Sequence, residues 1–135
     1  MPELTTNRSV EDAAIAWVME LERAAGREPR DVRHTRSPVD IVSPPRSIEV
    51  KAVGRSARGY DLPLELPQYA AAKEDPDFYL YVVDNVRQGD PAWFQLRVLG
   101  GETLQRMLAR AKEQRAYAVP WGCADYDRCP VGLVD

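Results

Sequence analysis

The spacing of apolar residues changes along the chain from a helical period to a strand period. In the stretch AAIAWVMELERAA, at positions 13–25, apolar side chains recur every three or four positions, which predicts an amphipathic helix over about residues 10–25. Ser9 precedes this stretch, and Asp12 lies three positions after Ser9, so Ser9 is the expected N-cap. Gly26 is the expected end of the helix.

Three short segments with β-branched residues follow this helix. They are RDVRHT, VDIV and SIEVKAV, at positions 30–35, 39–42 and 47–53, and each predicts a short strand. Pro44 and Pro45 separate the second segment from the third, which predicts a turn and an antiparallel hairpin. Apolar and charged residues alternate in the third segment, so Glu49 and Lys51 are expected to project to the same face.

The second half of the chain predicts two helices and two strands. The helices are PQYAAAKED (67–75) and GETLQRMLARAKEQR (101–115), and the strands are FYLYVVDNV (78–86) and WFQLRVL (93–99). The first of these strands is apolar almost throughout, which predicts a central strand covered on both faces. The whole order predicts an α/β fold with a mixed central β-sheet flanked by helices. We expect a single domain over residues 1–135, with its core at about residues 10–119 and a tail at 120–135. The residues at 117–119 are a candidate for one more short strand.

Length and composition agree with one globular domain. The chain has 135 residues, of which 44% are hydrophobic, and no apolar stretch is long enough to span a membrane. The N-terminal residues lack the pattern of a secretory signal, so a cytoplasmic protein with free thiols at Cys123 and Cys129 is expected. The net charge of −3 gives little indication of nucleic-acid binding, although the basic residues between positions 23 and 36 leave a phosphate-contacting face open.

Three charged residues interrupt the expected hairpin: Asp40, Glu49 and Lys51. Strand pairing would bring Asp40 close to Glu49, and two neighbouring carboxylates repel each other unless one is protonated or a cation lies between them. Oxygen ligands with room for water suit Mg²⁺, and a lysine beside them can orient a water or stabilise developing negative charge. The same spacing is also typical of the solvent-facing side of a strand, so the residues alone leave both interpretations open.

The order of motifs around these residues resembles the PD-(D/E)XK nuclease superfamily. PVDI is similar to the strand that carries the first aspartate, and IEVKA to the strand that carries the E-x-K pair. VEDAAIAWVMELERAAG is similar to the first core helix, and LPQYAAAKEDPDFYLYVVDNV to the following helix and strand. More narrowly, the chain resembles the NO VEIN C-terminal type of domain, an uncharacterised branch of that superfamily that is often attached to helicase-like or defence proteins. The match covers roughly residues 10–100.

The resemblance implies a restriction-endonuclease-like core and a set of site residues. The implied catalytic residues are Asp40, Glu49, Lys51, Glu11 and Gln68. Asp40 and Glu49 would ligate Mg²⁺ or Mn²⁺, with the Val50 carbonyl as a third ligand. Glu11 would bind a second metal or assist the first. Lys51 would position the attacking water or stabilise the phosphate, and Gln68 would line the site.

Arg55 and Arg58 follow Lys51 in a loop and are candidates for nucleic-acid contact. Flexible cations beside a metal site are where a backbone phosphate would lie. His34 is the only histidine, and without a nucleophile motif it is interpreted as a surface residue. Trp93, Phe94 and Trp121 could stack on bases, but their apolar neighbours favour core packing.

The expected function is metal-dependent hydrolysis of phosphodiester bonds in nucleic acid, with DNA as the expected substrate, in phage defence or repair. A helicase-like or defence-system partner and a homodimer are the expected associations, since cutting two strands needs two sites. The alternative is a catalytically inactive accessory module of the same fold that binds nucleic acid or a partner protein. The pI near 5.3 is low for a nuclease that acts alone on long DNA.

Overall fold

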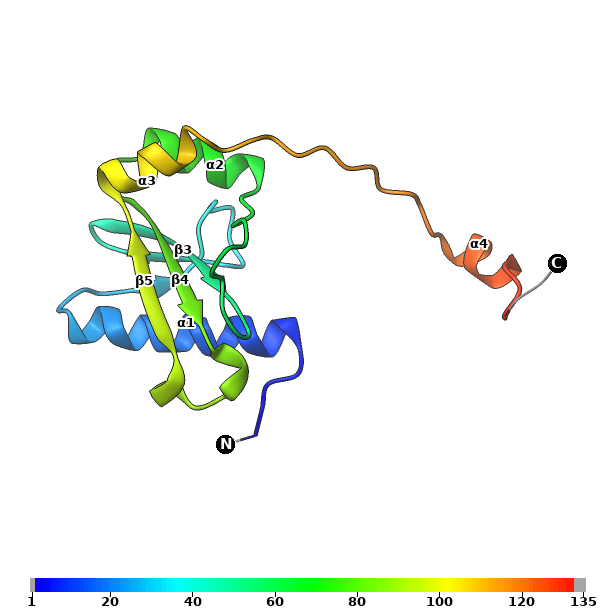
Figure 1. The fold of residues 1–135 in the computed structure, drawn as a ribbon, viewed down its shortest axis with the longest axis horizontal. Helices are drawn as coiled ribbons and strands as arrows, with labels where there is room; N and C mark the ends of the chain where they lie inside the picture. The colour runs from blue at the N-terminus through cyan, green and yellow to red at the C-terminus, as the bar shows by residue number, and fades with distance from the viewer. Residues whose placement is uncertain (1, 133–135) are drawn as a thin grey trace.

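The computed structural model describes residues 2–132 and contains a five-stranded sheet with helices on both faces (Figure 1). The helices are α1 (Asn7–Ala24), α2 (Leu66–Glu74), α3 (Gly101–Leu108) and α4 (Cys123–Arg128), with short 3₁₀ helices η1 (Val86–Gln88) and η2 (Pro91–Trp93). The strands are β1 (Arg30–Asp31), β2 (Ile41–Ser43), β3 (Arg46–Ala52), β4 (Phe78–Asp84) and β5 (Gln95–Leu99). The order in the sheet is β1-β2-β3-β4-β5. Only the β3–β4 pair is parallel within the described residues, so the predicted mixed α/β sheet is confirmed.

Helix α1 begins earlier than the sequence predicted. Thr6 is the N-cap, and its side-chain oxygen accepts a hydrogen bond from the Ser9 N–H at 3.0 Å. The Ser9 hydroxyl in turn accepts the Thr6 N–H at 3.2 Å. The prediction of Ser9 as the cap was wrong because Ser9 fills the third helical position of the capping box, where its hydroxyl bonds back to the cap.

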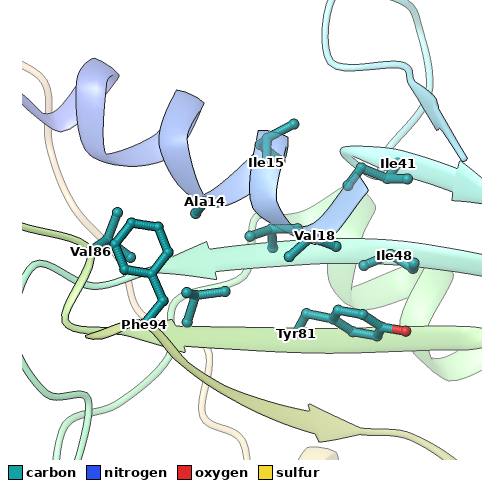
Figure 2. Packing of buried hydrophobic residues seen from close by; sticks show 10 residues of the cluster. Ala14, Ile15, Val18, Ile41, Ile48, Tyr81, Val86 and Phe94 are labelled. Atoms are coloured by element: carbon teal, nitrogen blue, oxygen red, sulfur yellow. The ribbon is translucent and has the colours of Figure 1, made fainter. Parts of the chain in front are cut away.

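One face of the sheet is covered by α1. Ala14, Ile15 and Val18 lie at helical spacing on α1 and pack against Ile48 of β3 and Tyr81 of β4 (Figure 2). These strand residues point to one side because side chains alternate between the two faces of a strand. The apolar stripe that predicted the helix is therefore the face that builds this half of the core.

Helices α2 and α3 cover the opposite face. Ala72 of α2 and Leu104 of α3 pack with Phe78, Leu80 and Val82 of β4. Strand β4 therefore contributes alternate residues to both core clusters. This confirms the prediction of a central strand that is buried on both faces.

The predicted second and third strands do pair as an antiparallel hairpin, with Ile41 opposite Ile48. The short strand predicted at residues 30–35 is confirmed only for its first two residues, because Arg30–Asp31 forms β1 and the chain then turns until β2 begins. The Thr35 hydroxyl donates to the Val32 carbonyl at 2.7 Å, a local bond that competes with strand pairing. Strand β2 begins at Ile41, so Asp40 lies directly before this strand and not within it.

The C-terminal part of the chain departs most from the prediction. Helix α3 ends at Leu108, the stretch 111–122 has no helix or strand, and α4 follows at Cys123–Arg128. The strand considered at 117–119 is therefore wrong. All residues from 109 to 132 are exposed, and in Figure 1 this segment leads away from the sheet. Too few apolar side chains recur at one spacing here to bury a face against the core.

Several smaller predictions can be compared directly. Core packing is confirmed for Phe94, which is buried and meets Trp17 edge to face at 5.4 Å. It is wrong for Trp93 and Trp121, which are each 62% exposed. His34 is exposed, and both cysteines are exposed free thiols. No helix within residues 2–132 has the length and apolarity needed to cross a bilayer.

The strand directions bring three segments to one end of the sheet. Strand β2 is antiparallel to β3, so the residues before β2 lie near the end of β3. Strand β4 is parallel to β3, so the residues after β4 lie there too. Asp40, Gly54 and Arg87 therefore lie at the same end of the sheet. Open α/β sheets bind ligands outside the carboxyl ends of their parallel strands.

Candidate active-site cleft

A cleft of about 790 Å³ opens at this end of the sheet, a volume typical of ligand sites. Its lining includes β3 from Glu49 onward, the segment 4–7 with the start of α1, and the loop 56–65 with the start of α2. The residues predicted to act in catalysis, Asp40, Glu49, Lys51, Glu11 and Gln68, all line this cleft, as does Val50. The topology thus brings together residues that lie far apart in the sequence.

Asp40 is fixed against β3 by two hydrogen bonds. Its backbone N–H donates to the Ile48 carbonyl at 3.1 Å, and its Oδ2 accepts the Val50 N–H at 2.9 Å. The paired residues of β2 and β3 end at Ile41 and Ile48, so the Asp40 carboxylate takes the place of a strand partner for Val50. This arrangement continues the register of the hairpin and sets Asp40 beside Glu49.

Glu49 is only 3% exposed. Burial, together with the negative charge of Asp40, raises the pKa of Glu49 to about 8, and Lys51 offsets only part of that increase. Its Oε1 atom is buried and makes no hydrogen bond to any residue that the structure describes. An unpartnered buried carboxylate oxygen is unfavourable, so this atom indicates a position for a ligand.

Lys51 lies on the same side of β3 as Glu49. In the register with β4, Glu49 is opposite Leu80 and Lys51 is opposite Val82, and both of these β4 residues belong to the core beneath α2 and α3. The Lys51 Nζ atom lies 3.3 Å from Glu49 Oε2. The prediction that the two charged residues share a face is therefore confirmed.

Glu11 and Gln68 lie on the walls of the cleft and are both held by local contacts. Glu11 has a half-exposed side chain, and its Oε1 lies 3.4 Å from Arg33 Nη1. The Arg33 guanidinium also bonds Asp12 and Asp31. Gln68 accepts the Glu65 N–H at 3.0 Å at the start of α2. The Glu11 carboxylate is thus paired with an arginine, whereas neither Asp40 nor Glu49 forms an ion pair with an arginine among the described residues.

Arg55 and Arg58 are exposed and do not line the cleft, although Gly54, Ser56 and Ala57 around them do. Arg87 lines the cleft, and the sequence did not predict it. Arg87 lies in the connection between two predicted strands, and only the parallel pairing of β3 with β4 places it beside Gly54. Its N–H donates to the Gly54 carbonyl at 3.0 Å.

Asp84 is a second residue that the sequence analysis missed. It is 6% exposed at the end of β4, and its Oδ1 accepts the Ala57 N–H at 3.0 Å. Its Oδ2 accepts a hydrogen bond from Arg97 Nη1 at 3.2 Å. Asp84 therefore anchors the wall loop to β4 and β5. The signal was a carboxylate at the end of the most apolar strand, where an unpaired charge would be costly.

The fit of this site to a divalent metal depends on which ligands are counted. Within residues 2–132, no group of three or more His, Cys, Asp and Glu side chains is arranged to hold a metal ion. Mg²⁺, however, is commonly bound by one or two carboxylates and keeps several waters. The two adjacent carboxylates and the unpartnered Glu49 Oε1 fit such a cation, because it would satisfy that oxygen and screen the repulsion between Asp40 and Glu49.

Comparison with known proteins identifies a family. Residues 10–96 match the family described as "Protein NO VEIN, C-terminal". No curated protein and no solved structure matches the chain. The matched region covers more than half of the chain and contains most of α1, the β2–β3 hairpin, α2 and β4. The chain therefore belongs to the family of NO VEIN C-terminal domains.

Proposed function

We propose that the chain is a metal-dependent nuclease domain that hydrolyses phosphodiester bonds in nucleic acid, with DNA as the expected substrate. The observation that carries this proposal is the buried Glu49 beside Asp40, with one unpartnered oxygen and with Lys51 Nζ 3.3 Å from the other. A restriction-endonuclease-like core is part of the proposal. It is supported by the order of an opening helix, an aspartate, the E-x-K strand, a helix and a parallel strand.

Asp40 and Glu49 would hold Mg²⁺ or Mn²⁺, with the Val50 carbonyl as a third ligand. Such a cation, when bound, supplies Lewis acidity and lowers the pKa of a coordinated water. Glu49 must lose its proton to act as a ligand, and the positive charge of Lys51 favours that ionised form. Asp40 is already oriented by the Val50 N–H, so this part of the ligand set is preorganised.

Lys51 would stabilise the charge that develops on the phosphate oxygens, or position the attacking water. Its side chain is one-fifth exposed, so the ammonium lies where the buried carboxylates meet the open cleft. A preorganised cation in such a position acts on the transition state more strongly than it would in water. Glu11 and Gln68, on opposite walls, would orient water or substrate around this centre.

A plasmid-nicking assay with Mg²⁺ or Mn²⁺ tests the proposal. Lys51→Ala should lower the rate by about a hundredfold, which is typical for the loss of one charge-stabilising donor. Lys112→Ala is the matched control, because Lys112 is exposed and lies beyond α3. Equal nicking by the wild type and Lys51→Ala would mean that Lys51 has no role in the reaction.

An inactive module of the same fold is the alternative function. It would bind nucleic acid or a partner protein through the same cleft and cut nothing. The acidic lining and the Lys51–Glu49 contact are compatible with that role only if some other group neutralises the carboxylates. Binding without metal-dependent cleavage would support this alternative. Association with a helicase-like or defence-system partner, and dimerisation, belong to the proposal in either case.

A further inference from the structure

Positive and negative charges are unequally distributed in the cleft. The lining contains five carboxylates against two cations: Glu11, Asp40, Glu49, Asp61 and Glu65 against Lys51 and Arg87. Lys51 is paired with Glu49. Arg87 makes no ion pair with any residue between 2 and 132. Of the two cations that line the cleft, Arg87 is therefore the one without an ion-pair partner among the described residues.

The position of Arg87 is fixed by the backbone on both sides. Its N–H donates to the Gly54 carbonyl at 3.0 Å, and its carbonyl accepts the Leu4 N–H at 2.9 Å. The guanidinium lies against Gly54, because a Cβ atom added to Gly54 would be 3.4 Å from Arg87 Nε. Arg87 thus offers a planar donor group at one side of the cleft, and such a group suits phosphate oxygens.

A second, smaller hollow of about 290 Å³ adjoins the cleft and shares Asp40, Glu65 and Gln68 with it. Arg33 and Arg36 line this hollow. Arg33 is occupied by three carboxylates. Arg36 is exposed and forms no ion pair within the described part of the chain.

The two unpaired arginines belong to segments on opposite sides of β3 in the sheet. Arg87 follows β4, Arg36 precedes β2, and β3 with Glu49 lies between those strands. A chain of linked phosphates that crosses Asp40 and Glu49 can contact both arginines.

Tyr60 adds a group that can recognise bases. Its side chain lines the cleft but is 77% exposed, and its N–H donates to the Ala57 carbonyl at 3.0 Å, within the loop that Asp84 anchors. Exposed aromatic rings beside a strand-binding groove can stack on the bases of unpaired strands.

We propose that the cleft binds one unpaired nucleic-acid strand that runs from Arg87 to Arg36 across Asp40 and Glu49, with a base stacked on Tyr60. This inference rests on the proposed function, since it assumes that the carboxylate pair lies at the bond to be cut. Arg87 and Arg36 are substrate-binding residues in this arrangement. Both flanking phosphates are held, so the strand is cut internally and a free end is not needed.

Fluorescence anisotropy with a labelled oligonucleotide tests the binding part. It is measured in Ca²⁺, in place of Mg²⁺, for the single strand and for the matching duplex. The single strand should bind more tightly, and Arg87→Gln, Arg36→Gln and Tyr60→Ala should each weaken its binding by about tenfold. Each arginine substitution should also lower the slope of log Kd against log salt by about 0.7.

Arg23→Gln and Tyr117→Ala are the matched controls, because Arg23 is exposed outside both hollows and Tyr117 is 99% exposed beyond α3. Both should leave binding unchanged. Arg87→Lys should recover part of the loss, which a merely structural role would not predict, and equal melting temperatures would show that the variants fold. Unchanged affinity and salt slope in Arg87→Gln and Arg36→Gln, or a duplex bound as tightly as the single strand, would overturn the inference.

Cleavage of a circular single strand in Mn²⁺ tests the internal cut. Opening of the circle by the wild-type protein supports the inference, whereas cleavage of linear strands alone overturns it. If the wild type binds the strand through these residues but cuts no substrate, the proposed nuclease function fails while the strand path stands. If it cuts and the arginine variants match their controls, the strand path fails while the nuclease function stands.

Discussion

Glu49 is the residue whose charge depends most on its surroundings. It is nearly fully buried, Asp40 lies beside it, and its pKa is raised to about 8. The alternation of apolar and charged residues in β3 predicted where its side chain points, but not that the carboxyl would be protonated at neutral pH. That state follows from the packing of Asp40 and the walls of the cleft, which lie outside the local pattern.

This environment predicts how stability depends on pH in the metal-free protein. Glu49 keeps its proton up to about pH 8 when folded, but ionises near 4.5 when unfolded. The folded state binds more protons between these values, so the free energy of unfolding should fall as pH rises from about 4.5 to about 8. Glu49→Gln cannot ionise and should flatten this dependence in urea unfolding across the same range. A wild-type curve no steeper than that of Glu49→Gln would contradict the account.

A second buried carboxylate, Glu22, lies on α1 outside the cleft. Arg27 Nε and Nη2 donate to it at 2.6 Å and 2.8 Å, and the Tyr81 hydroxyl donates at 3.0 Å. Burial alone would raise the pKa of Glu22, but the bonds from Arg27 and Tyr81 outweigh it and the pKa is lowered. Glu22 is thus a satisfied structural ion, in contrast to Glu49.

Arg27→Ala should therefore lower the free energy of unfolding by about 3 kcal/mol, because it leaves a buried charge without its main partner. Urea unfolding at neutral pH measures this loss. Arg23→Ala removes an exposed arginine from the same helix and should change stability by less than about 0.5 kcal/mol. Equal losses in the two variants would show that the Glu22–Arg27 pair contributes nothing specific.

At the scale of elements, the spacing of apolar residues predicted those strands whose positions depend on local burial. The continuous apolar run of β4 and the Pro-Pro turn of the hairpin gave the central strand and the β2–β3 register that sets Asp40 beside Glu49. The parallel pairing of β3 with β4 depends on how α2 crosses the sheet, which no local pattern encodes. Arg87 and Asp84 were missed for that reason, since their roles exist only once the ends of β3 and β4 are side by side.

The junction of β5 and α3 offers a test of packing between elements. A Cβ atom added to Gly100 would collide with the Tyr79 ring. The Arg46 guanidinium stacks on that ring at 4.1 Å from its centre. Gly100→Ala should therefore destabilise the fold by about 2 kcal/mol, measured by urea unfolding. Gly122→Ala, in the exposed segment, should not. The Gly100→Ala loss should disappear in a Tyr79→Ala background, and its persistence there would contradict this explanation.

At the scale of the whole molecule, the fold is confined to the part of the chain up to α3. Residues 109–132 are all exposed, so their removal takes away little buried surface. A chain that ends at Glu113 should keep the melting temperature of the full chain within about 2 °C. A loss of several degrees in a calorimetric scan would mean that the exposed segment packs on the body in solution.

The central claim is that Asp40 and Glu49 hold one divalent cation at the end of the sheet, and calorimetric titration with Mn²⁺ tests it most directly. The wild-type protein should bind Mn²⁺ at millimolar concentrations or below, and Asp40→Ala should abolish binding. Asp77→Asn removes an exposed carboxylate outside the cleft and should bind as the wild type does. No heat of binding in the wild type at millimolar Mn²⁺, or equal binding by Asp40→Ala, would contradict the account.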